Sequence, residues 1–192
     1  RELTPREKDR RLARELETLL DSGQRDTARE RLQSRLTTDS GAPRARAVMA
    51  RHHLARGDAQ QARRWLPDSV VERYPALRLL RARAAKQEQG AAEALAWLRR
   101  DPPAVEDNPD YHTMMAALYQ QSDQPREAAR IWAGLIEMDD SRARWWAGLG
   151  IALESQGRSD RARAAYRQAA KLPGLPQQLR RYVEQRLTGE QG

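Results

Sequence analysis

Apolar residues recur with a helical period along almost the whole chain. β-Branched residues are few and never alternate with polar ones over a useful length, so strands are not expected. Turn residues interrupt the helical pattern at nearly regular intervals, at Gly23, Gly57, Gly90, Asp123 with Pro125, and Gly157. This pattern predicts an all-α protein built from repeats.

A pair of apolar residues lies just after each turn. The first member is alanine, at positions 28, 62, 94, 128 and 162, so that successive alanines are 34, 32, 34 and 34 residues apart. The second lies four residues later and is large: Leu32, Leu66, Leu98, Trp132 and Tyr166. Residues four apart share one face of a helix, so the alanine admits a neighbouring helix and the large side chain fills the space beside it. Each unit is therefore predicted to be a helix, a turn and a second helix.

The spacing predicts one repeat domain over residues 1–192. Five repeats are expected at about 9–42, 43–74, 75–108, 109–142 and 143–176, followed by a solitary amphipathic capping helix at 177–187. The stretch DPPAVEDNP, residues 101–109, contains three prolines and is expected to be an irregular link. Asn108 is expected to cap the helix that begins at Pro109.

Composition narrows the function classes. An apolar fraction of 39% without phenylalanine leaves alanine, leucine and five tryptophans to supply most of the core, and the absence of cysteine excludes disulfides and thiolate chemistry. The net charge of +8 comes almost entirely from arginine, with lysine only at positions 8, 86 and 171. This balance suits nucleic acid or an acidic partner. Codon usage in a GC-rich genome produces the same bias, and we favour that explanation.

The chain contains no candidate membrane span. Its apolar runs stay well short of the roughly 20 residues that cross a bilayer, and no signal peptide is visible. Because the chain begins at Arg1 without methionine, we expect a fragment whose anchor or targeting segment is absent from this sequence.

The repeat pattern resembles the tetratricopeptide repeat (TPR), a helix–turn–helix unit of 34 residues. The last repeat carries the resemblance best, through Trp146, Leu149, Gly150, Leu153, Gly157, Ala162, Tyr166 and Ala169. The fourth matches with substitutions, through His112, Met115, Ala116, Tyr119, Ala128, Trp132 and Leu135, and the first three are degenerate. The resemblance implies an all-α, right-handed superhelical solenoid of about five repeats and a non-enzymatic scaffold that binds a protein or peptide.

A finer resemblance concerns the C-terminal part. The runs RWWAGLGIALESQGRSDRARAAYRQA and GLPQQLRRYVEQRL are similar to the C-terminus of TPR proteins from bacterial MSHA-type (type IV) pilus biogenesis loci. That resemblance implies periplasmic repeats anchored in the inner membrane by a segment outside this chain, working in pilus or secretion-type assembly. Without it, a cytoplasmic location is expected.

Catalytic, cofactor and metal sites are not expected. Neighbouring helix residues point about 100° apart, so His52 and His53 do not easily share a metal ion, and no cysteine or HExxH spacing accompanies them. His112 stands where the repeat places tryptophan, so packing is the favoured interpretation for all three histidines. The glycines at 148 and 150 do not form a phosphate loop, because no strand precedes them.

In a solenoid of this type, the first helices of the repeats line a concave groove. The residues predicted to line it are Arg10, Arg14, Arg44, Arg51, Leu79, Leu80, Arg83, Lys86, Thr113, Met114, Gln120, Gln121, Arg144, Gly148 and Ile151. A basic groove favours acidic peptides held by arginine. Two alternatives stay open: a solvated charged surface without a ligand, and a basic helical repeat that contacts nucleic acid.

Four residues of the last repeat raise separate questions. Gly150 is predicted to be small because the two helices of the repeat cross there, whereas Gly148 marks either close approach of a ligand backbone or sequence drift. Trp146 is predicted to fill the core. Trp145 either packs against the preceding helix, which we favour, or is an exposed anchor for a partner or a second copy of the chain.

Overall fold

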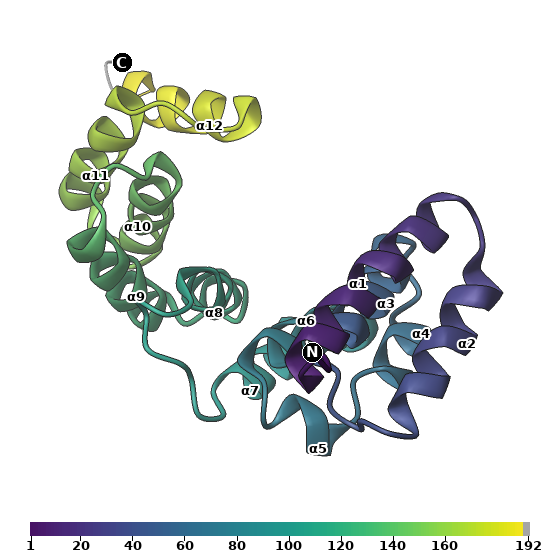
Figure 1. The fold of residues 1–192 in the computed structure, drawn as a ribbon. Coiled ribbons are helices and arrows are strands. Elements are labelled where there is room, and N and C mark those ends of the chain that lie inside the picture. Colours follow the sequence, from purple (N-terminus) through teal and green to yellow (C-terminus); the bar gives the residue numbers. More distant parts are fainter. Residues whose placement is uncertain (190–192) are drawn as a thin grey trace. The chain divides into compact units, whose positions relative to one another are not determined.

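The structure is a computed structural model that describes residues 1–189, and over that range it is helical with no strand. The helices are α1 (Pro5–Asp21), α2 (Arg25–Leu36), α3 (Pro43–Ala55), α4 (Ala59–Arg64), α5 (Asp68–Val71), α6 (Pro75–Glu88), α7 (Ala91–Leu98), α8 (Pro109–Gln121), α9 (Pro125–Met138), α10 (Ala143–Ser155), α11 (Ser159–Lys171) and α12 (Gln177–Thr188) (Figure 1). Within residues 1–189, no helix is long and apolar enough to cross a membrane.

The helices group into two compact units, which we call unit 1 (Arg1–Asp101) and unit 2 (Pro102–Gly192). The division falls in the proline-rich link between α7 and α8, where the chain forms no helix. Asn108 accepts a hydrogen bond from the backbone N–H of Tyr111 at 3.1 Å and caps α8, as the sequence predicts. Each unit is described by itself.

Unit 1 contains three helical hairpins, α1–α2, α3–α4 and α6–α7, with the single turn of α5 before the third (Figure 1). The first helices of successive hairpins pack on one another, α1 on α3 and α3 on α6. Leu16 and Leu32 lie at the centre of one apolar cluster, and Leu66 and Leu77 at the centre of the next; all four are 0% exposed. The first helices therefore form one continuous face within this unit.

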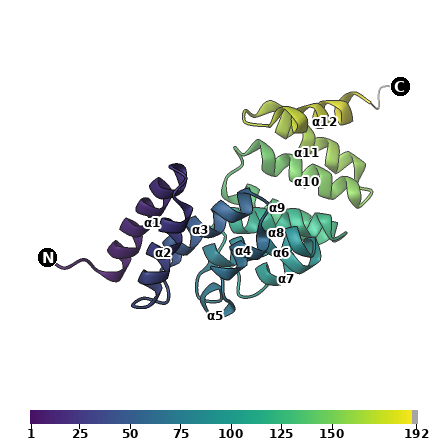
Figure 2. The same ribbon diagram turned by 90° about the vertical axis from the view of Figure 1, so that its right-hand side faces the viewer.

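Unit 2 contains two hairpins, α8–α9 and α10–α11, followed by α12. Helix α9 packs on α10, and α12 packs on α11, so that α10, α11 and α12 follow one another as layers (Figure 2). Val183 of α12 is 0% exposed, and Leu179 and Leu187 pack beside it on the last hairpin. The predicted capping helix therefore covers the end of the last repeat.

The predicted repeat pairs form the core. The five alanines are 0–2% exposed, and their large partners four residues later are 0–8% exposed. The turn residues Gly23, Gly57, Gly90, Asp123 and Gly157 all have positive φ, as a tight turn between two helices requires. For an L-residue this conformation costs about 1–2 kcal/mol, although aspartate tolerates it better than most. Asp123, with φ 57°, is the one turn of the five that lacks glycine.

A nitrogen-bearing side chain at the fourth residue of the first helix contacts loop carbonyls in four consecutive repeats. Arg46 of α3 donates to the carbonyls of residues 40, 41 and 65 at 2.8–3.0 Å, and Arg78 of α6 donates to those of residues 71, 72, 100 and 101. His112 Nε2 lies 2.7 Å from the carbonyl oxygen of residue 103, and Trp146 Nε1 donates to that of residue 140 at 2.8 Å. We call these four side chains the loop-anchoring residues.

Candidate functional site

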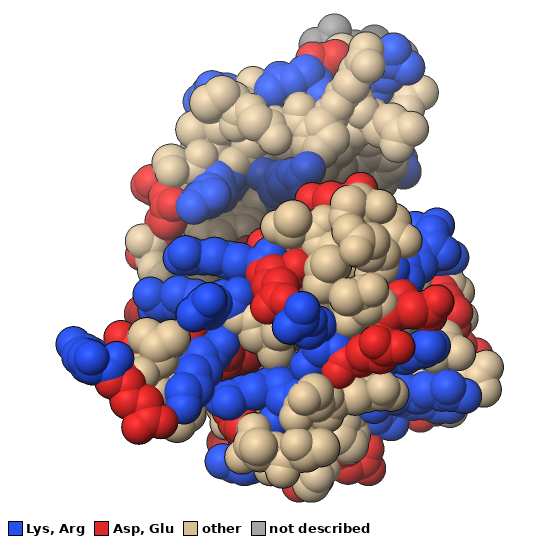
Figure 3. Space-filling model, turned by 45° about the vertical axis from the view of Figure 1, so that its right-hand side comes forward, with Lys and Arg blue, Asp and Glu red and all other residues tan. Residues whose placement is uncertain are grey.

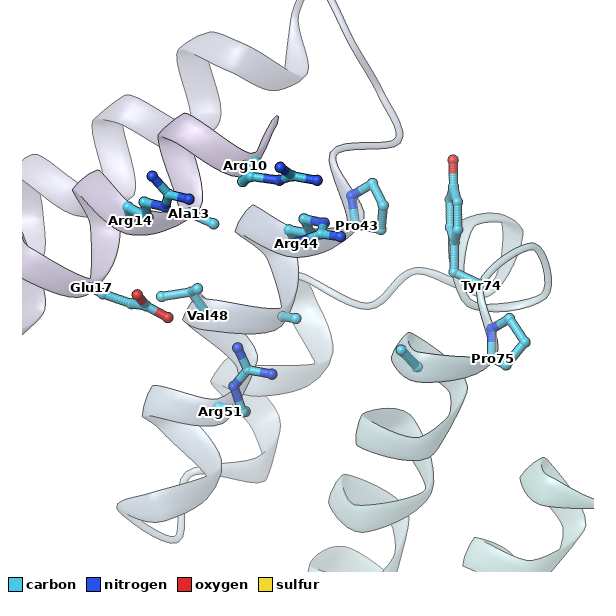
Figure 4. Close-up of a pocket in the computed structure, with 12 residues that line it drawn as sticks. Arg10, Ala13, Arg14, Glu17, Pro43, Arg44, Val48, Arg51, Tyr74 and Pro75 are labelled. Carbon is cyan, nitrogen blue, oxygen red and sulfur yellow. The ribbon is translucent and has the colours of Figure 1, made fainter. Parts of the chain in front are cut away.

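A hollow of about 620 Å³ opens on the first-helix face of unit 1 (Figure 4). We call it the basic groove. Its lining comes from α1, α3 and the start of α6, and consists of Arg10, Ala13, Arg14, Glu17, Pro43, Arg44, Ala47, Val48, Arg51, Tyr74, Pro75 and Ala76. Four of these residues are arginine and one is acidic.

A buried carboxylate fixes the two helices that form most of the groove. Asp9 of α1 is 3% exposed, and its two carboxylate oxygens accept hydrogen bonds from the backbone N–H groups of Arg44 and Ala45, each at 3.0 Å. Helix α3 needs this external cap, because its N-cap residue Ala42 offers no side-chain acceptor. Sequence reasoning missed Asp9. Its signal was Pro43 at the start of a helix without a capping residue before it.

The groove arginines lie on two facing rows. Arg10 and Arg14 are one turn apart on α1, and Arg44 and Arg51 are two turns apart on α3; all four are exposed. Within residues 1–189, none of the four has a carboxylate oxygen within 4.0 Å of a guanidinium nitrogen. Arginines outside the groove of unit 1 do form such pairs, for example Arg35 with Asp39 at 2.8 Å.

What distinguishes the groove is that it gathers, around one hollow, four arginines that have no ion-pair partner among residues 1–189. Figure 3 shows Lys and Arg side chains over much of one face of the molecule, with Asp and Glu side chains among them. A basic surface alone therefore does not identify a site in this protein. Four neighbouring guanidinium groups that form no ion pair within the described chain repel one another, and an anionic ligand would relieve that repulsion.

Small side chains form the floor between the two rows. Ala13, Ala47 and Val48 are each 6–9% exposed, and Val48 lies on the same face of α3 as Arg44 and Arg51, since these residues are three or four positions apart. Figure 4 shows Glu17 extending from α1 toward Val48. The groove thus combines cationic walls with a shallow apolar floor.

The structure places the predicted groove residues of unit 1 in two groups. Arg44 and Arg51 line the basic groove together with Arg10 and Arg14. Leu79, Arg83 and Lys86 lie further along α6, beyond the lining residues: Leu79 is half-buried, and the two cations are exposed. Leu80, also predicted to face the groove, is 5% exposed and belongs to the core.

In unit 2, the predicted residues do not gather in one place. Thr113 and Arg144 line a separate hollow of about 530 Å³. The Gln120 amide donates to Ser155 Oγ at 2.8 Å, which joins α8 to α10. Met114 and Ile151 are half-buried, and Gln121 is exposed.

The structure contradicts the interpretation that Gly148 marks close approach of a ligand backbone. A Cβ at this position would lie 2.5 Å from Cε2 of the Trp132 indole, so the space beside Gly148 belongs to the preceding hairpin. The glycine is required by packing and leaves no room there for a ligand backbone. Gly150 confirms the prediction made for it, because a Cβ there would overlap Cε1 of Tyr166 on the second helix of the repeat.

The two adjacent tryptophans also differ from part of the prediction. Trp145 is 8% exposed and packs in one cluster with Trp132 and Leu135 of α9. The favoured prediction, that Trp145 packs against the preceding helix, is therefore confirmed, and the alternative of an exposed anchor is wrong. Trp146, predicted to fill the core, is only half-buried and places its indole N–H on a loop carbonyl. Its position in the repeat is the loop-anchoring position.

The histidines lie outside the basic groove. The rings of His52 and His53 meet edge to face, with centroids 5.4 Å apart. Burial is the largest cause that lowers the pKa of both side chains, and the neighbouring charges of Arg25 and Arg56 lower it further. Over residues 1–189, no three His, Cys, Asp or Glu side chains come together in a geometry that could hold a metal ion.

The hairpins, their repeated core pairs and the terminal helix define an all-α helical-repeat protein. Two tetratricopeptide-repeat family models match the chain, at residues 19–68 and 113–176, and together they cover more than half of it. The chain therefore belongs to the tetratricopeptide-repeat proteins.

Solved structures agree with this fold. The chain is similar to TTC0263, a thermophilic TPR protein of Thermus thermophilus, with 21% identity, a TM-score of 0.59, and coverage of 93% of this chain and 98% of that one. Two structures of MamA match with TM-scores of 0.66 and 0.67 at 17% and 16% identity; they cover 81% and 88% of this chain and 92% and 98% of their own. A search of curated proteins finds no match.

Proposed function

We propose that this chain is a non-enzymatic scaffold that binds a partner protein or peptide in the basic groove of unit 1. TPR repeats generally mediate protein–protein interactions, and the groove lies on the face formed by the first helices of consecutive repeats. The observation that carries the proposal is the set of four exposed arginines, at positions 10, 14, 44 and 51, that have no ion-pair partner among residues 1–189.

The chemistry of the lining supports binding rather than catalysis. Guanidinium groups stay protonated at any physiological pH, so they attract and orient anions but do not exchange protons. Glu17 is the one carboxylate in the lining, no histidine, serine or threonine accompanies it, and the hydroxyl of Tyr74 points away from it (Figure 4). A nucleophile with an adjacent general base is therefore not assembled in the groove.

The cellular setting rests on sequence alone. The similarity of residues 144–169 and 174–187 to pilus-biogenesis TPR proteins supports a place in a type IV pilus or secretion-type envelope assembly, with the repeats in the periplasm. Fractionation of cells that produce the full protein tests this setting. Recovery in the inner-membrane fraction, with the repeats accessible from the periplasm, supports this setting. Recovery in the cytoplasmic fraction contradicts it.

Site-specific photo-crosslinking in cells that produce this protein tests the groove itself. A photoreactive amino acid at Ala76, which lines the groove and is exposed, should capture a protein partner; the same amino acid at Ala92, exposed on α7, is the matched control. The Ala76 adduct should disappear when Arg44 and Arg51 are both replaced by glutamate. Adducts that are identical at both positions, or that survive the charge reversal, would show that the groove is not the binding site.

A further inference from the structure

We propose that the basic groove takes an extended peptide segment in which two carboxylate side chains flank an apolar one. This inference rests on the proposed function and specifies the partner. It uses the order of side chains along α3, the charges on α1 that face them, and the floor between the two helices.

Helix α3 presents a basic–apolar–basic row to the groove. Arg44, Val48 and Arg51 share one face, and all three line the hollow. With a rise of 1.5 Å per residue, Arg44 and Arg51 lie about 10 Å apart along the helix axis. An extended chain in the polyproline II conformation advances about 3.1 Å per residue and brings every third side chain to the same face, so two acidic residues three positions apart match this distance. A side chain between them then points away from the arginine row, toward the floor of the groove.

Helix α1 makes the two ends of the groove unequal. Arg10 and Arg14 add two positive charges beside α3, and Figure 4 shows Arg10 and Arg44 extending in the same direction. Toward the other end, Glu17 adds a negative charge on α1. The end of the groove near Arg10 and Arg44 therefore attracts a carboxylate more strongly than the end near Arg51, and the more acidic end of the segment should lie there.

Carboxylates are the anions that this lining suits. A guanidinium group presents paired N–H donors that match the two oxygens of a carboxylate, and such charge-assisted pairs are stronger than neutral hydrogen bonds. A nucleic-acid backbone would bring phosphates close to Glu17 and has no apolar side chain for the floor formed by Ala13, Ala47 and Val48. The combination of an acid in the wall and an apolar floor favours a peptide.

Fluorescence anisotropy with defined peptides tests the inference. The probe is a synthetic nonapeptide, capped at both ends, with two glutamates three residues apart, one leucine between them, and a glycine–serine background. Replacement of both glutamates by glutamine should weaken binding at least tenfold, and replacement of the leucine by serine about threefold. Because the ends are capped, a terminal carboxylate cannot account for binding.

Protein variants locate the bound peptide. Arg44→Gln and Arg51→Gln should each weaken binding of the acidic peptide about tenfold, whereas Arg64→Gln should leave it unchanged. Arg64 is the matched control, because it is an exposed arginine of the same unit, at the end of α4 and outside the groove lining. Unchanged circular dichroism and thermal unfolding of each variant would show that the fold is intact.

The outcomes separate this inference from the proposed function. If the glutamine peptide binds as tightly as the acidic one and Arg44→Gln weakens neither, the acidic pattern is wrong, and the Ala76 crosslink still decides whether the groove binds a protein. If no peptide binds, this inference is likewise overturned. Tighter binding of a single-stranded oligonucleotide, lost in Arg44→Gln, would assign the groove to nucleic acid and overturn both proposals.

Discussion

Units 1 and 2 are built from the same helical hairpin, but they use different side chains at equivalent positions. In unit 1, the loop-anchoring residues are Arg46 and Arg78, and each joins the loop before the first helix to the residues just after the second helix. In unit 2, they are His112 and Trp146, and each binds one carbonyl of the preceding loop. Each arginine thus links both ends of its hairpin, whereas His112 and Trp146 each contact only the loop at the start of theirs.

This difference explains why the second and third repeats are degenerate in sequence and still regular in structure. A guanidinium group has five N–H donors and can satisfy several carbonyls at once. Arg46 is 6% exposed, and burial lowers its pKa, so its hydrogen bonds must compensate for the loss of water around the charge. The polar contacts replace the aromatic side chains that unit 2 keeps.

The largest expected effect is the loss of such an arginine. Arg46→Met keeps the length and apolar stem of the side chain but leaves three loop carbonyls without their donor, and the free energy of unfolding should fall by about 3 kcal/mol. Trp146→Phe in unit 2 loses one hydrogen bond near an exposed loop and should cost about 1 kcal/mol. Urea unfolding followed by circular dichroism measures both. Equal losses in the two variants would contradict the difference between the units.

Most of the fold follows from the sequence, because its determinants are local and repeated. The alanine pairs and the turn residues recur at near-constant spacing, so each repeat supports the boundaries predicted for its neighbours. Asp9 could not be found in this way, since its partners on α3 lie 35 and 36 positions away. Trp145 and Trp146 show the same limit: which of two neighbours is buried depends on the rotation of α10 against α9.

The candidate site was predictable only in part. Helical spacing puts Arg44 and Arg51 on the groove face, but it does not show which arginines elsewhere find acidic partners. Gly148 was misplaced for a related reason. The residue that fills the space beside it, Trp132, belongs to the preceding repeat, and the direction of that side chain depends on how the two hairpins pack.

The glycines of unit 2 provide the next test, with a smaller expected effect. Gly150→Ala would place a methyl group in the space that the Tyr166 ring occupies, and the repeat should lose about 2 kcal/mol as the ring moves away. Gly134→Ala is the matched control on α9, where nothing lies within 4 Å of the new methyl group. That exposed helical position should gain about 0.5–1 kcal/mol. Thermal or urea unfolding that shows the same sign for both variants would contradict the tight helix crossing inferred here.

The smallest expected effect is a pH dependence that unit 1 contributes through His52 and His53. Both pKa values are lowered in the folded state from the ordinary 6.5, by burial first and by the charges of Arg25 and Arg56, while Asp58 partly opposes the shift at His53. As the pH falls through 6.5, the unfolded chain therefore binds protons that the folded chain resists. The free energy of unfolding should be highest above about pH 7.5 and should decrease toward pH 5.5.

A double variant isolates this contribution. Glutamine is neutral at every pH and close to histidine in size, so replacement of both His52 and His53 by glutamine should flatten the stability profile between pH 7.5 and 5.5. The carboxyl groups whose pKa values are lowered by hydrogen bonds, Glu7 and Asp139, have ordinary values of 4.5 and 3.8 and act below this window. Urea unfolding at several pH values measures the profile. If the free energy of unfolding instead rises as the pH falls from 7.5 to 5.5, the folded state favours protonated histidine. That result would contradict the effect expected from the burial of this pair and from the neighbouring cations.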